Sequence, residues 1–170
     1  MTSTIRIAAL AASLSLVALG VRAEPLAEPT GDVLLTVSGA IARADAEGVA
    51  RLDRAMLEAL PVAEFTTATI WTEGAHSFTG VPLADLLEHV GAEGALLRAS
   101  AINDYTVEIP VDDAVSGGPI VAYRMDGEEM SVRDKGPLWI VYPYDASADY
   151  RNEIIYARSI WQLDRIEVVR

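Results

Sequence analysis

A series of short β-rich segments, separated by glycine, proline, asparagine or aspartate, is the feature that most constrains how this chain can fold. The segments are residues 33–39, 65–72, 96–102, 105–110, 120–125, 138–142 and 159–169. Short apolar or alternating runs bounded by turn-forming residues are typical of strands. Two further stretches have apolar residues at helical spacing. We therefore predict an α/β domain of the mixed α+β kind, with several short strands and two main helices.

The two predicted helices are marked by different signals. In the first, helical spacing ends at Pro61, and the apolar residues are Leu52, Met56, Leu57 and Leu60. The second follows Pro82 and ends at Gly91, and its apolar stripe consists of Leu83, Leu86, Leu87 and Val90. Proline suits a first helical turn and glycine suits a C-terminal cap, so the second helix is bounded at both ends.

Asp126-Gly127 separates two short segments and is the dipeptide that a tight two-residue hairpin turn prefers. Both central residues of such a turn need positive φ, which glycine and aspartate tolerate better than most residues. We predict a β-hairpin centred on this pair.

The first residues have the pattern of a secretory signal peptide. Arg6 precedes an apolar run from Ile7 to Val21, and Val21-Arg22-Ala23 has small residues at its first and last places. This run of 15 residues is shorter than the ~20 that a membrane span needs, which favours cleavage over a retained anchor. We expect residues 1–23 to be removed, 24–31 to form an extended leader and 32–170 to form the domain, located in the periplasm.

The chain is strongly acidic, with a net charge of −12. The predicted signal peptide holds two arginines and no acidic residue, so its removal changes the net charge to −14. Such a surface repels nucleic acid and anionic lipid headgroups. A neutral or cationic small molecule, or a protein partner, is the expected ligand class, and no stable membrane insertion is expected after cleavage.

The chemistry-bearing residues exclude several kinds of site. The chain has no cysteine and only two histidines, His76 and His89, so neither a disulfide nor a structural zinc site is expected. Phosphate-binding loops and the Gly-x-Ser-x-Gly nucleophile motif are absent from the sequence. Stability must therefore come from the apolar core.

Several segments, in order, resemble the oxidoreductase molybdopterin-binding domain of the sulfite oxidase type. They are His76–Leu87, Asn103-Asp104-Tyr105, Ile120–Glu128, Gly136–Pro143, and Trp161 followed by Ile166-Glu167-Val168. The resemblance covers nearly all of the chain after the predicted signal peptide. It implies the sulfite oxidase-like molybdopterin-binding fold.

The chain departs from catalytic members of that family at the residue that binds molybdenum. The resemblance places a cysteine where this sequence has Trp71 or, as the alternative, Thr72. An indole offers no anionic soft donor to a metal, but it offers a large flat surface for a heteroaromatic ring. The chain is thus more similar to short periplasmic pterin-binding proteins of this fold, which implies a noncatalytic sensor of a free, reduced pterin that reports to a membrane-bound signalling partner.

We predict that ligand-contacting residues lie in loops near the predicted strand ends. They are Trp71, Thr72, Glu73, His76, Ser77, Asn103, Asp104, Tyr105 and Arg151. Each has an ordinary alternative: a core position for the tryptophan, solvated loop positions for the acids, and a surface charge for the arginine. Trp139 and Trp161 are expected in the core.

Two other functions stay open at this point. One is a molybdopterin-dependent oxidoreductase with atypical metal ligation, although bound molybdenum is not expected without a thiolate. The other is an interaction domain whose pocket is filled by its own side chains and which binds no cofactor.

Overall fold

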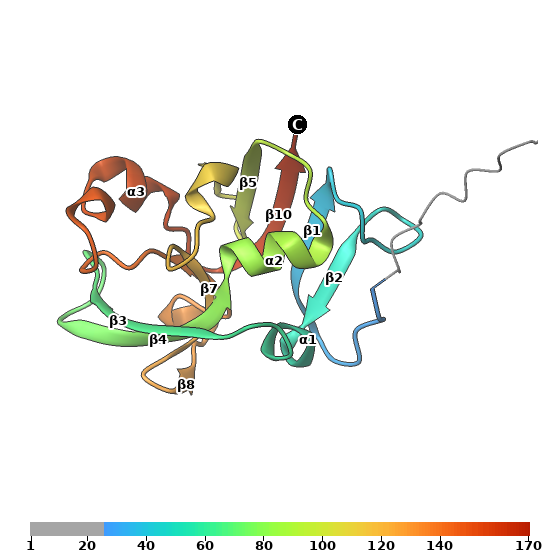
Figure 1. Ribbon diagram of the computed structural model, residues 1–170. Helices are drawn as coiled ribbons and strands as arrows, with labels where there is room; N and C mark the ends of the chain where they lie inside the picture. Colours follow the sequence, from blue (N-terminus) through green and yellow to red (C-terminus); the bar gives the residue numbers. More distant parts are fainter. Residues whose placement is uncertain (1–25) are drawn as a thin grey trace, which may run out of the picture.

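The computed structural model of the chain describes residues 26–170, which form two β-sheets and three α-helices (Figure 1). The predicted signal peptide lies outside the described residues. Residues 26–31, the described part of the predicted leader, form neither helix nor strand. No helix of the described part of the chain is long and apolar enough to cross a membrane.

The first sheet has the strand order β2-β1-β10-β5-β6. Its strands are β1 (Val33–Gly39), β2 (Ala50–Asp53), β5 (Leu96–Ala101), β6 (Thr106–Pro110) and β10 (Leu163–Val169). Strands β1 and β10 run parallel, whereas the other neighbours run antiparallel. The C-terminal strand therefore lies at the centre of the sheet, between the first strand and the β5–β6 hairpin.

The second sheet has the strand order β3-β4-β7-β8, with β9 also paired to β7. Its strands are β3 (Ala63–Ala68), β4 (Ala75–Pro82), β7 (Ile120–Met125), β8 (Glu128–Glu129) and β9 (Trp139–Val141). The turn between β7 and β8 has φ of 53° at Asp126 and 81° at Gly127. The predicted tight hairpin is confirmed.

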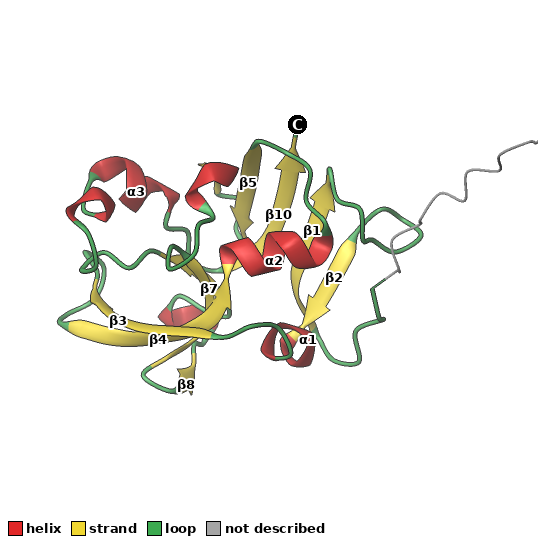
Figure 2. Ribbon diagram, in the orientation of Figure 1, coloured by secondary structure: helices red, strands yellow, loops and turns green. Residues whose placement is uncertain are grey.

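The helices are short, and the secondary-structure colouring of Figure 2 distinguishes them from the strands they connect. They are α1 (Arg54–Glu58), α2 (Leu83–Val90) and α3 (Glu153–Arg158), together with single 3₁₀ turns at Val111–Asp113, Val132–Asp134 and Ala148–Tyr150. Helix α2 is confirmed as predicted: its four apolar stripe residues are buried, and Gly91 caps it with φ of 63°. Figure 1 shows α2 near the middle of the molecule, between the β3–β4 ribbon and the first sheet.

Both sheets contribute to one apolar core. In β1, Leu35 and Val37 are fully buried while Leu34, Thr36 and Ser38, which alternate with them, are only partly buried, as expected for a sheet with one face covered. Trp139 on β9 is fully buried, which confirms its predicted core position. Burying a side chain such as Leu or Val contributes roughly 1.5–3 kcal/mol, so this core is the main source of stability in a chain without disulfides.

Several predicted elements differ from the structure. Leu52 lies in strand β2, and α1 begins only after Asp53, whose side chain accepts a hydrogen bond from the Met56 backbone N–H at 2.9 Å. This N-cap fixes the start of α1 later than the apolar spacing suggested. The strand predicted over residues 65–72 ends at Ala68.

His76 and Ser77 lie in strand β4 and not in the loop predicted for them. The reason is a β3–β4 hairpin in which Thr67 pairs with His76 and Ala68 with Ala75. Residues 69–74 are its connection, so Trp71 and Thr72 are loop residues. Helix α3 was not predicted, and the strand predicted over 159–169 begins at Leu163.

Candidate functional site

A cavity of about 420 Å³ opens beside helix α3. Four separate stretches form it: the β3–β4 connection, the β5–β6 turn, the C-terminal half of α3, and the segment between α3 and β10. The lining residues are Trp71, Ala101, Asn103, Tyr105, Tyr156, Ala157, Ser159, Ile160, Trp161 and Gln162. Because its walls come from stretches far apart in sequence, the cavity exists only in the folded domain.

Trp71 anchors an aromatic cluster at the cavity. Its ring lies 5.3 Å from that of Trp161 and 5.9 Å from that of Tyr156, both in edge-to-face orientation. Edges of Trp139 and Tyr144 are also near, at 5.9 and 6.4 Å between ring centroids. Edge-to-face packing is one of the two arrangements that aromatic rings prefer, the other being offset stacking. Four neighbouring rings thus hold Trp71 in place while it remains partly exposed to the cavity.

Local hydrogen bonds fix the loop that carries Trp71. Its backbone N–H donates to Thr69 Oγ1 at 3.1 Å, and that hydroxyl lies 2.8 Å from the hydroxyl of Thr72. Thr72 is therefore a structural neighbour of Trp71 and does not line the cavity. A side chain that packing and backbone contacts both restrain loses little conformational entropy when a ligand binds.

The polar groups of the cavity are neutral. Asn103 Oδ1 accepts a hydrogen bond from the Tyr105 backbone N–H at 3.2 Å, and Gln162 Nε2 donates to the Val132 carbonyl at 2.7 Å. The amide N–H₂ of Asn103 and the carbonyl oxygen of Gln162 therefore stay available. Among the described residues, no hydrogen bond engages the indole N–H of Trp71 or Trp161, and neither group is sealed inside the core. The cavity thus offers flat aromatic surface together with several hydrogen-bonding groups.

Two arginines lie near the cavity, and carboxylates hold both. Arg158 Nη1 is 3.0 and 2.8 Å from the two carboxylate oxygens of Asp113, and the Tyr142 hydroxyl donates to the same carboxylate at 2.8 Å. Burial, with help from Asp113, raises the pKa of Tyr142 far above its usual range, so the phenol stays a donor. Arg165 Nη2 is 2.6 Å from Asp104 Oδ1.

Three of the nine predicted site residues line the cavity: Trp71, Asn103 and Tyr105. Asp104 lies in the same turn as the last two, but its side chain is 86% exposed and pairs with Arg165. Arg151 is exposed, directly after the 3₁₀ turn at Ala148–Tyr150, and lies outside the lining.

Glu73, His76 and Ser77 do not line this cavity, and their polar contacts tie the β3–β4 hairpin to the β7–β8 turn. His76 Nδ1 is 2.6 Å from Asp126 Oδ2, and His76 Nε2 is 2.9 Å from the Glu73 carbonyl oxygen. The Ser77 backbone N–H donates to Asp126 Oδ1 at 3.0 Å, whereas its hydroxyl donates to Glu64 within the hairpin at 2.9 Å. The hydrogen bond that His76 donates to the Asp126 carboxylate raises the pKa of His76, and the same bond lowers the pKa of Asp126.

The sequence did not predict the part of the cavity wall that is formed by the segment between α3 and β10. Trp161 is only partly buried and lines the cavity, which corrects its predicted place inside a core strand. It makes a single β-bridge with Trp139, and strand β10 starts two residues later. Tyr156 was not singled out either. A cluster of aromatic residues around α3 was the available signal, but their common orientation requires the fold.

Comparison with family models supplies the observation that decides the family. Residues 52–168 match the model described as the oxidoreductase molybdopterin-binding domain. The chain belongs to this molybdopterin-binding family. The match confirms the resemblance and the sulfite oxidase-like fold class, and the mixed α+β architecture with two sheets agrees with it. No curated protein matches the chain.

Members of this molybdopterin-binding family bind molybdopterin, so the residues at the cavity can be tested against that cofactor. Molybdenum in the catalytic members is bound by a cysteine thiolate, and this chain contains no cysteine. Among the described residues, no group of three or more His, Asp or Glu side chains could hold a metal ion. The lining also contains no arginine or lysine for the cofactor's phosphate. The cavity residues therefore fit a neutral heteroaromatic ring and do not fit the metal-bearing, phosphorylated cofactor.

Proposed function

We propose that this domain is a noncatalytic pterin receptor of the periplasm. It binds a free, reduced pterin or a closely similar heterocycle in the cavity beside α3, and it reports the bound state to a membrane-bound signalling partner. The single observation that carries the proposal is the position of Trp71, which presents an indole at the cavity. The family resemblance places the cysteine of catalytic members at Trp71 or, as the alternative, at Thr72.

The size and chemistry of the cavity support this ligand class. Its volume of about 420 Å³ is in the usual range for small-molecule sites, roughly 300–1,000 Å³. Trp71 and Trp161 provide flat apolar surface, while Asn103 and Gln162 provide amide groups. A pterin has a flat bicyclic ring with donors and acceptors along its edge, so stacking and amide hydrogen bonds can be made together.

A second groove next to the cavity supports the proposal that the domain has a protein partner. Tyr105 and Ala157 line both hollows, and the groove continues over Val107, Glu108, Glu153, Ile154 and Arg158. Tyr105 and Ile154 are 58% and 63% exposed, and exposed large apolar side chains that gather at one place are typical of interaction sites. Because a bound ligand would touch Tyr105, cavity occupancy can alter the surface that the partner meets.

The direct test is titration of the purified domain with reduced and oxidised pterins, following quenching of tryptophan fluorescence. We expect saturable binding that Trp71→Ala abolishes. Trp71 also packs against four rings, so this variant loses stability as well, and Tyr105→Ala is the second variant because its side chain is exposed. Tyr150→Ala is the matched control, since Tyr150 contacts Tyr142 and lies outside the cavity lining.

Each outcome separates the proposal from its alternatives. Binding that is weakened by Tyr105→Ala and retained by Tyr150→Ala supports a pterin receptor. No binding by a folded wild-type domain would support the ligand-free interaction domain, whose pocket is closed by the Trp71 cluster. Stoichiometric molybdenum in protein isolated from its native host would instead support an oxidoreductase with atypical ligation.

A further inference from the structure

We infer that the cavity discriminates against phosphorylated ligands and accepts the free alcohol or unsubstituted form of its heterocycle. The inference rests on the proposed function and names the ligand class more narrowly. It concerns a phosphate carried on the ring's side chain, which would lie at the cavity mouth when the ring stacks on Trp71.

The first reason is that the lining has no group suited to a phosphate dianion. Phosphates in proteins are held by arginine, by lysine, or by free backbone N–H groups at a helix N-terminus. All ten lining residues are neutral. Helix α3 meets the cavity through its C-terminal half, and at its N-terminus Asn152 Oδ1 already accepts from the N–H groups of Ile154 and Ile155 at 3.0 Å each.

The second reason is that the arginines near the cavity are already neutralised. Arg158 forms two hydrogen bonds with Asp113, a residue whose side chain is only 16% exposed. Arg165 pairs with Asp104 and, at 3.1 Å, with Asp164. Its Nη2 also reaches the carbonyl oxygen of Ala101, a lining residue, at 3.4 Å. Thus Arg165 lies at the cavity edge, but its charge is cancelled there.

The third reason is that exposed carboxylates lie around the mouth, although two of them, Asp104 and Glu108, also pair with arginines. Asp104 stands between the lining residues Asn103 and Tyr105 with 86% of its side chain exposed. Glu108 and Glu153 border the adjoining groove. A phosphate entering this region would meet several like charges, in a chain whose net charge is −12. Like-charge repulsion of this kind lowers affinity and weakens as salt screens it.

The test compares one pterin in two forms, neopterin and neopterin monophosphate, in calorimetric titrations of the same purified domain at low and high salt. We expect the phosphate form to bind more weakly by about tenfold or more at low salt, and we expect this ratio to shrink as salt is added. Equal binding of the two forms, or tighter binding of the phosphate, would overturn the inference while the proposed function stands. No binding of either form would overturn both.

Asp104→Asn provides the matched variant. Asp104 has φ of 65°, a conformation that asparagine also tolerates, so the turn is retained while one negative charge is lost and Arg165 is partly released. We expect this variant to reduce the ratio between the two affinities by about threefold. The affinity for neopterin monophosphate should rise, and the affinity for neopterin should stay the same. Glu128→Gln changes the net charge equally, on the β7–β8 hairpin of the other sheet, and should leave the ratio unchanged. An equal effect of both variants would show that no selectivity resides at the cavity mouth.

Discussion

His76 is held by two hydrogen bonds that suit only its protonated ring. Nδ1 faces the Asp126 carboxylate, and Nε2 faces the backbone carbonyl of Glu73. Both partners are acceptors, whereas a neutral imidazole has one donor and one acceptor nitrogen. The imidazolium therefore links the connection that carries Trp71 to the β7–β8 turn. We therefore expect the Trp71 loop to respond to pH.

The first prediction concerns the stability that this contact provides. The pKa of His76 is raised above its ordinary value of 6.5, so its contribution is fully present below pH 6.5 and is lost as pH rises through the raised pKa. The lowered pKa of Asp126 has the opposite consequence, because its contribution is lost only in more acidic solution, below its ordinary 3.8. Wild type should exceed His76→Gln in free energy of unfolding near pH 5.5, with the difference decreasing in alkaline solution.

Urea denaturation of both proteins across this pH range measures the difference, and His89→Gln is the control. Burial lowers the pKa of His89, so its contribution should instead be lost as pH falls. If the difference in free energy of unfolding between wild type and His76→Gln were constant from pH 5 to pH 9, the protonated His76 contact would not contribute to stability.

Individual residues also show where sequence reasoning succeeds. Trp71, Asn103 and Tyr105 could be placed at the cavity because they follow or precede recognisable strands and match the family's order. Trp161 could not, because a tryptophan among apolar residues near a strand has the same local pattern whether it is buried or faces a cavity. Its exposure depends on α3 and Trp71, which are distant in sequence from each other.

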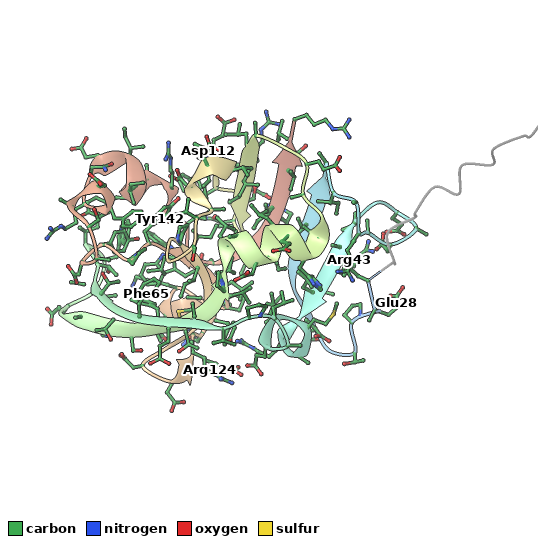
Figure 3. The ribbon with its side chains drawn as sticks, viewed as in Figure 1. Glu28, Arg43, Phe65, Asp112, Arg124 and Tyr142 are labelled. Carbon is green, nitrogen blue, oxygen red and sulfur yellow. The ribbon has the colours of Figure 1, made fainter. Side chains whose placement is uncertain are left out.

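At the scale of elements, the short helix α3 forms one wall of the cavity and is held by contacts with residues that are remote from it in sequence. Its last residue, Arg158, pairs with Asp113 across 45 positions, and Tyr142 donates to the same carboxylate. Figure 3 places Asp112 and Tyr142 on the same side of the molecule as α3. The cavity keeps its wall because this cluster holds the helix.

The second prediction follows from that cluster. Asp113→Ala leaves Arg158 and the Tyr142 hydroxyl without their shared acceptor, which should lower the free energy of unfolding by about 2–3 kcal/mol. We also expect weaker pterin binding, because Tyr156 and Ala157 of α3 line the cavity. Thermal and urea denaturation measure the first effect, and titration measures the second. Asp112→Ala, at the exposed neighbouring position, should change neither, and equal effects of the two substitutions would contradict the account.

The strands and α2 were predictable because each carries its own period and its own turn residues, as in the hairpin at Asp126-Gly127. Helix α3 was not, since its six residues are too few for a full apolar stripe. Its start depends on the Asn152 cap, and its end on Asp113. Short elements fixed by tertiary contacts carry little local signal.

For the whole molecule, the fold and the ligand site are determined by different kinds of information. The ordered segments that resemble the family extend over most of the domain, and the family model covers residues 52–168, so the fold could be inferred from sequence. The cavity is formed where the β3–β4 connection, the β5–β6 turn and α3 meet. No single segment specifies that meeting point, so the sequence indicated only part of its lining.

The central claim is that a pterin stacks at Trp71 and Trp161. Proton–nitrogen NMR spectra test it most directly, because they report on the indole N–H signal of each of the three tryptophans. Trp71 and Trp161 line the cavity, whereas Trp139 is fully buried behind them and outside the lining. Adding reduced pterin should shift the Trp71 and Trp161 signals saturably, and the Trp139 signal less. If all three signals stayed unchanged at saturating pterin in a folded domain, the cavity would not be a pterin site.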